Sequence, residues 1–122
     1  MEFQWVTLKV MDLAVSKSFY GDFLGLDFHQ EISIGEGTAI AFYITANGTQ
    51  IELIESPGTL TEPIQGVSIG LATERYDEIL EGARDQKILQ GEPRVLGGYL
   101  ECFFIFDPDG LSIQVIRKAE EN

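Results

Sequence analysis

The chain has 122 residues, 44% of them hydrophobic, which is enough for one domain with its own core. Its formal net charge of −12 opposes binding to nucleic acid or to anionic membranes, and no apolar run approaches the ~18 residues of a membrane-spanning helix. Met1–Lys9 lacks the basic start and apolar centre of a secretory signal, so we expect a soluble, cytoplasmic protein.

The first half of the chain predicts a strand, a helix and three further strands. Phe3–Val10 alternates as a strand should, with Trp5, Thr7 and Lys9 on one face. Asp12 is the expected cap of a helix that runs to Leu24 before Gly25. Its expected apolar stripe is Val15, Phe19, Tyr20, Phe23 and Leu24. The three strands are predicted at 28–34, 38–44 and 49–55, and Asn47-Gly48 is a strong hairpin signal between the last two.

The second half predicts the same order of elements after a connector at residues 56–63. A strand at 67–72 precedes a helix at 73–84, for which Thr73 is the expected cap. The expected stripe of this helix is Tyr76, Ile79, Leu80 and Ala83. Strands follow at 87–95, 99–106 and 111–117, with Asp107-Pro108-Asp109-Gly110 as the last turn. We expect the charged tail at 118–122 to be frayed.

The two halves look like copies of one unit. Gly48 and Gly110 each follow a turn-forming Asn or Asp and each open an alternating strand, 62 positions apart. The first strands align at an offset of 63, which places Ser68 opposite Trp5 in the alignment. A long unit present twice indicates one pseudo-symmetric domain, and we expect the function to lie where the two copies face each other.

Several short motifs resemble the vicinal oxygen chelate superfamily, which includes glyoxalase I, extradiol dioxygenases and bleomycin-binding proteins. The motifs are Val10-Met11-Asp12-Leu13, Ser18-Phe19-Tyr20, Phe23-Leu24-Gly25-Leu26, Ile51-Glu52-Leu53 and Asp107-Pro108-Asp109-Gly110. The resemblance implies an α+β fold of two tandem βαβββ modules, at about 1–56 and 64–118 of a single domain spanning 1–122. It also implies that the sheets curl into a cupped, pseudo-two-fold cavity with the helices outside.

In metal-dependent members of that superfamily, each module supplies one ligand from its first strand and one from its last. Those positions here are Trp5, Glu52, Ser68 and Gln114, and only Glu52 keeps a family ligand type. A Lewis-acid metal needs three or more converging donors, so we expect a dismantled metal site and no cofactor. A weak hard ion held by Glu52, Gln114 and water stays open.

Each candidate residue also has an ordinary structural interpretation. Glu52 is either a solvent-facing strand residue or a cavity carboxylate. Gln114 is likewise either part of the cavity lining or an ordinary polar strand residue. Trp5 is either core packing or a stacking platform opposite Glu52, and Lys9 could pair with Glu52. His29 has no recognisable catalytic partner, and we expect it in a surface or packing role. We expect Cys102, the only cysteine, to be a buried inert thiol.

Two classes of function remain, and an interaction module with no ligand is a third. The preferred hypothesis is a metal-free protein that binds a small planar, neutral-to-cationic organic molecule through Trp5, Thr7, Lys9, Glu52, Ser68 and Gln114. The alternative is a glyoxalase-like lyase or isomerase acting on a small carbonyl metabolite, with Glu52 as general base. We also expect a homodimer, because Phe103, Phe104 and Phe106 exceed what one sheet face needs.

Overall fold

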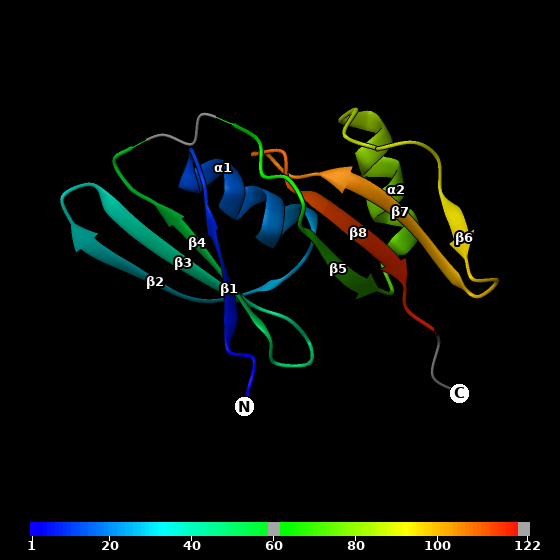
Figure 1. Ribbon diagram of the computed structural model, residues 1–122, viewed down its shortest axis with the longest axis horizontal. Helices are drawn as coiled ribbons and strands as arrows, with labels where there is room; N and C mark the ends of the chain where they lie inside the picture. Colours follow the sequence, from blue (N-terminus) through cyan, green and yellow to red (C-terminus); the bar gives the residue numbers. More distant parts are fainter. Residues whose placement is uncertain (59–61, 120–122) are drawn as a thin grey trace. The chain divides into compact units, whose positions relative to one another are not determined.

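The computed structural model describes residues 1–58 and 62–119 (Figure 1). Within it the chain forms two compact units, Met1–Glu62 and Pro63–Asn122. The middle of the expected connector, 59–61, and the end of the expected tail, 120–122, lie outside the described residues. None of the helices in the described part of the chain has the length and apolarity needed to cross a membrane.

The first unit is a four-stranded mixed sheet with one helical segment. Its elements are β1 (Trp5–Lys9), α1 (Leu13–Lys17), η1 (Ser18–Phe23), β2 (Asp27–Gly35), β3 (Thr38–Ile44) and β4 (Gln50–Glu55). The strand order is β1-β4-β3-β2, in which β1 and β4 are parallel and the other pairs antiparallel. The predicted strands are therefore present within one or two residues of their expected ends.

The predicted helix at 12–24 is present, but it changes type halfway. Asp12 caps it as expected, since Oδ1 of Asp12 accepts a hydrogen bond from the backbone N–H of Val15 at 3.3 Å. From Ser18 the helix widens into the π-helix η1, where Leu24 donates to the carbonyl of Phe19. Gly21 lies in this wide turn, and a Cβ there would be 2.9 Å from Cε1 of Tyr43. The missing side chain thus allows the helix to approach β3 closely.

The expected apolar stripe of this helix was partly wrong. Val15 is 50% exposed, whereas Leu13, Ser16, Tyr20 and Leu24 are buried. Positions 13, 16, 20 and 24 follow the spacings of three and four that place residues on one helix face, and Val15 lies on the opposite side. A small hydroxyl side chain therefore occupies the core position that the pattern had assigned to valine.

The second unit repeats this plan, with an α-helix throughout in place of the α-helix and π-helix of the first unit (Figure 1). Its elements are β5 (Ser68–Thr73), α2 (Tyr76–Asp85), β6 (Arg94–Leu96), β7 (Leu100–Phe106) and β8 (Ser112–Arg117). The order β5-β8-β7-β6 matches that of the first sheet, and β5 pairs with β8 in parallel. The two-module α+β architecture implied by the resemblance is confirmed.

The expected strand at 87–95 is mostly wrong. Only Arg94–Leu96 forms a strand there, and Leu89 makes a single bridge to Ile105. Gly91, with φ of 73°, and Pro93 interrupt the extended backbone before β6. The remaining edge strand is short, and all three of its residues are exposed.

Thr73 is not the cap of the second helix. It is the last residue of β5, and its hydroxyl oxygen accepts a hydrogen bond from the N–H of Arg75 at 3.0 Å. The helix begins one residue after Arg75, which has no side-chain capping bond. Tyr76 at the first helical position is 1% exposed and meets Phe103 edge to face at 4.9 Å between ring centroids. Burial of this ring, rather than a polar cap, sets where the helix starts.

An ion-pair cluster joins α2 to its sheet. The guanidinium of Arg117 lies 4.2 Å from the ring centroid of Tyr76 and binds Asp77 and Glu101, each at 2.9 Å. The hydrogen bond from Arg117 holds the pKa of Asp77 below its ordinary value, and the hydrogen bonds that Arg117 donates to Asp77 and Glu101 raise its own pKa. The cluster fastens the first turn of α2 to β7 and β8.

The two sheets also agree in register. Trp5 lies opposite Gln50 and Thr7 opposite Glu52 in the first sheet, while Ser68 lies opposite Ser112 in the second. These pairs keep the offsets of 63 and 62 that the sequence shows. The repeat is therefore preserved residue by residue in the parallel strand pairs.

The two tight turns allow a matched test of this fold. Gly48 and Gly110 have φ of 91° and 87°, but only at Gly110 would a Cβ meet another residue, at 2.8 Å from Cβ of Pro63. We expect Gly48→Ala to lower the free energy of unfolding by about 1–2 kcal/mol through backbone strain. Gly110→Ala should cost about 1–3 kcal/mol more, because the rigid proline blocks the added methyl. Urea denaturation measures both, and equal losses would contradict the proposed contact.

Candidate ligand-binding site

The first sheet has one face covered by its helix and one face open. Leu8, Ala41, Ile51 and Leu53 are at most 5% exposed and share the covered face. Alternation along the strands then places the intervening residues on the other face. This open face of the first sheet carries four of the six predicted site residues: Trp5, Thr7, Lys9 and Glu52.

Glu52 lies at the centre of this open face. Its cross-strand neighbours are Thr7 on β1 and Phe42 on β3, and it is half-buried. The hydroxyl of Thr7 donates to Oε1 of Glu52 at 2.9 Å. This bond orients the carboxylate, and among the described residues no group donates a hydrogen bond to Oε2. A charged, oriented oxygen on a half-buried face can bind a cation or accept a proton.

Lys9 does not neutralise Glu52. Lys9 is exposed at the end of β1, and within the described parts of the chain it forms no ion pair. The alternative in which the two charges cancel is therefore wrong.

Trp5 is an exposed ring beside this carboxylate. It is 47% exposed, and its ring meets that of Phe42 edge to face at 5.7 Å. The expectation that Trp5 stands opposite Glu52 was wrong by one pair, because its direct partner is Gln50. Trp5 and Glu52 are instead diagonal neighbours on one face. Trp5 lies on β1 and Phe42 on β3, with β4 between them. The contact between the Trp5 and Phe42 rings therefore crosses β4.

Phe42 is a site residue that the sequence reasoning missed. It is 7% exposed, although it lies on the face that the helix does not cover. The register of the predicted hairpin could have identified Phe42. The turn at Asn47-Gly48 joins β3 to β4, and counting outward from it brings Phe42 opposite Glu52.

The second sheet has an equivalent open face with different chemistry. Ser68, Gly70 and Ala72 on β5 are small and exposed, and Gly70 lies opposite Gln114. Nε2 of Gln114 donates to the sulfur of Cys102 at 3.4 Å. Thus Ser68 and Gln114, the remaining two predicted site residues, share the open face of the second sheet but are not direct partners.

Cys102 and His29 are the other two residues considered in the sequence analysis, and neither is a strand partner of Trp5 or Glu52. Cys102 is fully buried and free, as expected. His29 is exposed on β2, next to the irregularity in pairing between Phe28 and Gln30. Neither lies beside Trp5 or Glu52 in the strand register.

The residues at the four family ligand positions do not fit a transition metal. The indole of Trp5 has no lone pair to offer, and Glu52 is the only carboxylate of the four. Gln114 offers only a neutral carbonyl oxygen and Ser68 only a neutral hydroxyl, which are poor ligands for a transition metal. Within the described parts of the chain, no three His, Cys, Asp or Glu side chains are grouped closely enough to hold a metal ion.

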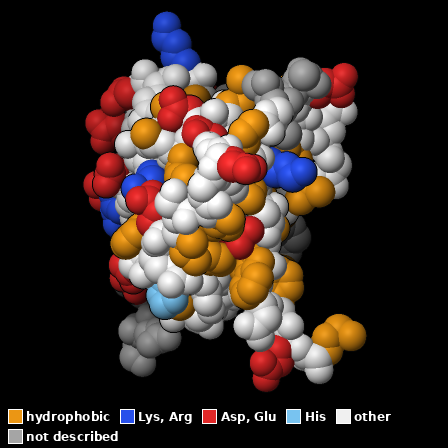
Figure 2. All heavy atoms as spheres, turned by 90° about the vertical axis from the view of Figure 1, so that its left-hand side faces the viewer, with side chains coloured by type: hydrophobic (Ala, Val, Ile, Leu, Met, Phe, Trp, Pro, Cys, Tyr) orange, Lys and Arg blue, Asp and Glu red, His pale blue; other side chains and the backbone are white. Residues whose placement is uncertain are grey.

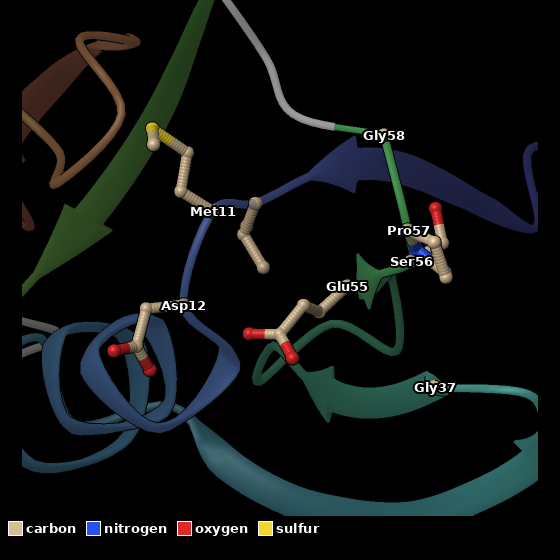
Figure 3. A pocket seen from close by; sticks show the side chains of 8 residues that line it. Met11, Asp12, Gly37, Glu55, Ser56, Pro57 and Gly58 are labelled. Carbon is tan, nitrogen blue, oxygen red and sulfur yellow. The ribbon is translucent and has the colours of Figure 1, made fainter.

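A separate hollow of about 570 Å³ opens in the first unit, near the start of α1 (Figure 3). Two carboxylates of its wall are visible in Figure 3, Asp12 and Glu55. Both bind the helix start: Asp12 caps Val15, and Oε1 of Glu55 accepts from the N–H of Leu13 at 2.8 Å. The hollow is lined by Val10, Met11, Asp12, Gly37, Glu55, Ser56, Pro57 and Gly58, and includes none of the predicted site residues.

Comparison with known proteins gives a family and a fold. The sequence profile of the Glyoxalase/Bleomycin resistance protein/Dioxygenase superfamily matches residues 2–115. Among curated proteins, no sequence matches this chain significantly.

Solved structures of 19–20% sequence identity share the fold. A glyoxalase family protein from Bacillus cereus matches with a TM-score of 0.81 and 20% identity, over 98% of this chain and 95% of that one. A superfamily domain from Frankia sp. matches with a TM-score of 0.76 and 19% identity, over 98% of both chains. A glyoxalase I variant from Zea mays reaches a TM-score of 0.83 at 20% identity, but this chain covers only 46% of its length.

Proposed function

This chain belongs to the Glyoxalase/Bleomycin resistance protein/Dioxygenase superfamily, and we propose that it is a metal-free binding protein for a small planar, neutral-to-cationic organic molecule. The observation that carries the proposal is the pairing of an exposed aromatic ring with an oriented carboxylate. Trp5 and Glu52 share the open face of the first sheet, and Thr7 holds Glu52 in place.

The two groups contribute different parts of the binding. A cation over the face of Trp5 gains about 0.5–1 kcal/mol at an exposed site, which alone gives almost no affinity. A charge-assisted hydrogen bond to Oε2 of Glu52 adds direction, and burial of ligand carbon adds roughly 25 cal/mol per Å². Most of the affinity must therefore come from apolar contact. The charge selects which planar molecules bind.

Other predicted residues have supporting roles in this proposal. Lys9 is exposed on the same face and would limit the ligand's positive charge at that end of β1. Ser68 and Gln114 lie on the open face of the second sheet, where they would offer hydroxyl and amide hydrogen bonds to a ligand bound in that unit. We place the protein in the cytoplasm, a reducing compartment, because its one cysteine is a free thiol.

A catalytic alternative rests on the same carboxylate. Glu52 could act as general base for a glyoxalase-like lyase or isomerase that acts on a small carbonyl metabolite. The favourable observation is that Oε2 has no recorded donor among the described residues, so it can accept a substrate proton. The three other ligand positions hold no second acid or base, which is why binding without turnover is preferred.

Trp5 is the only tryptophan, so its fluorescence reports on the proposed site. We expect planar amines to quench or shift its emission in a saturable way. Glu52→Gln should weaken cationic hits about tenfold, equivalent to ~1.4 kcal/mol for a partly shielded charge contact, and leave neutral hits nearly unchanged. Glu74→Gln, at an exposed position of the second unit, is the control with the same change of charge.

The same titration separates binding from catalysis. Hits that ignore Glu52, or a panel that leaves Trp5 emission unchanged, would contradict the binding proposal. The catalytic alternative would then be tested by turnover of small carbonyl compounds, which Glu52→Gln should abolish.

The residues at the four family ligand positions predict that the protein binds its ligand without a transition metal. Elemental analysis after mild purification should find less than one tenth of an equivalent of Ni, Zn, Mn or Fe, on the order expected for adventitious traces. The prediction would be contradicted if one equivalent of metal per chain were found that is lost in Glu52→Ala but kept in Glu74→Ala. That result would favour a metal-dependent function like that of the metal-dependent superfamily members.

We also propose that the protein is a homodimer, although the sequence argument for it needs correction. Phe103 is fully buried against Tyr76 within the second unit, so it cannot contribute to an interface. Better support comes from β2, an edge strand whose nine residues are all exposed. Phe28, Ile32 and Ile34 on it are 41–60% exposed. Figure 2, which faces the side of Figure 1 where β2 lies, shows exposed hydrophobic side chains among acidic ones.

An unpaired apolar edge strand can pair with the same strand of a second copy. Light scattering at micromolar concentration should therefore give the mass of two chains. A charge at the centre of the strand, Ile32→Lys, should shift the protein toward the monomer, and Val95→Lys on the short edge strand β6 is the control. A monomer mass for the unchanged protein would refute the proposal.

A further inference from the structure

The open face of the second sheet holds one charge, and that charge is positive. By alternation, the strand residues on this face are Ser68, Gly70, Ala72, Arg94, Leu96, Leu100, Cys102, Phe104, Phe106, Ser112, Gln114 and Ile116. No carboxylate is among them, although the chain has 20 acidic and 8 basic residues. A single arginine on an otherwise uncharged face is therefore distinctive in this protein.

Arg94 is also the exception among the four arginines. The other three bind carboxylates: Arg75 pairs with Glu78, Arg84 with Glu92, and Arg117 with Asp77 and Glu101. Arg94 has no carboxylate partner within the described parts of the chain. The acidic residue nearest to it in sequence, Glu92, is held by both terminal nitrogens of Arg84 at 2.8 and 3.0 Å.

The guanidinium of Arg94 is exposed and lies beside an aromatic ring of the same face. It lies 5.8 Å from the ring centroid of Phe104, and its Nη2 is 3.6 Å from the point where a Cβ on Gly91 would lie. Phe104 is the direct cross-strand partner of Gln114, so the cation, the ring and the amide occupy neighbouring positions.

We propose that this cluster is a second binding site, which takes the carboxylate of an aromatic or other planar apolar acid. The planar guanidinium of Arg94 matches the two oxygens of a carboxylate, and the amide of Gln114 is a further hydrogen-bonding group beside it. The apolar part of the ligand packs on Leu96, which is 38% exposed and lies two residues from Arg94 on the same face of β6, and on the ring of Phe104. The site lies wholly in the second unit and does not depend on binding at Trp5.

The negative charge of the whole protein does not prevent this. At physiological salt the Debye length is about 8 Å, so distant carboxylates slow the approach of an anion more than they weaken a direct contact. A two-point hydrogen bond to a guanidinium acts at contact distance. The net charge should therefore appear mainly as a slow association rate.

The test uses the full chain labelled with ¹⁵N and two acids, benzoate and 2-naphthoate. Their neutral shape-matched amides, benzamide and 2-naphthamide, are the ligand controls. We expect saturable shifts of the Gln114 side-chain amide and of the Arg94 Nε–H signal. Each acid should bind about tenfold or more tightly than its amide, the size expected for hydrogen bonds to a charged group. Naphthoate should bind more tightly than benzoate, because it buries more apolar area.

Variants then assign the effect. Arg94→Gln should reduce acid binding to the level of the amide, and Arg94→Lys should fall between, because lysine keeps the charge but not the planar pair of donors. Arg75→Gln, which removes the same charge from the start of α2, should change nothing. Equal affinity for acid and amide, or undiminished binding in Arg94→Gln, would overturn the proposal. If Arg94→Gln does not fold, the acid–amide comparison on the unchanged protein decides.

Failure here and failure of the proposed function are distinguishable. Trp5 emission reports on the first unit, while the Gln114 and Arg94 signals report on the second. Acids that bind the second unit while planar amines leave Trp5 unchanged would refute only the proposed function. The opposite result would refute only the carboxylate site.

Discussion

The parallel pairing of the first strand of each unit with its last strand is the constraint on which both sheets depend. In the first unit it aligns β1 with β4 from Trp5 to Lys9, and in the second it aligns β5 with β8. A shift of one residue in either pair would turn every side chain to the other face. Because one face of each sheet must bury its apolar residues against a helix, only one register is stable. The other face is left for polar and exposed aromatic groups.

The same constraint has produced two different surfaces from one plan. In the first unit the open face carries Trp5 and the carboxylate of Glu52, held by Thr7. In the second the corresponding strand has small residues, and the face carries Gln114 and Arg94 in place of an acid. The exposed residues on the open faces, unlike the buried Phe42 and Cys102, contribute little to the core, so they can change at small cost to the fold. This explains how a fold shared at about 20% identity with glyoxalase structures can carry different residues on its open faces.

Structural features were predicted correctly from the sequence where local interactions control them, and incorrectly where long-range contacts do. Strand and helix order, the Asp12 cap and both glycine turns follow from short patterns, and the structure has them where they were expected. The Thr73 cap failed because burial of Tyr76 against Phe103, on a strand almost thirty residues later, sets the start of α2. Long-range contact therefore decided the boundary that local preference had placed two residues too early.

The sequence by itself determined that Trp5, Thr7 and Lys9 share a strand face, since alternation has a period of two, and that the chain contains two related units. It also indicated the superfamily, and it shows Trp5, Ser68 and Gln114 at three of the four positions aligned with family metal ligands, which are matters of residue identity. Only the tertiary structure decided that Thr7 rather than Lys9 bonds Glu52 and that Phe42 adjoins Trp5. It also decided that Arg94 lies beside the Phe104 ring without a carboxylate partner in the described parts of the chain. These contacts join different strands, and their partners depend on strand order and register. One strand's pattern specifies the direction of a side chain, whereas the neighbour it meets is chosen by the assembled sheet.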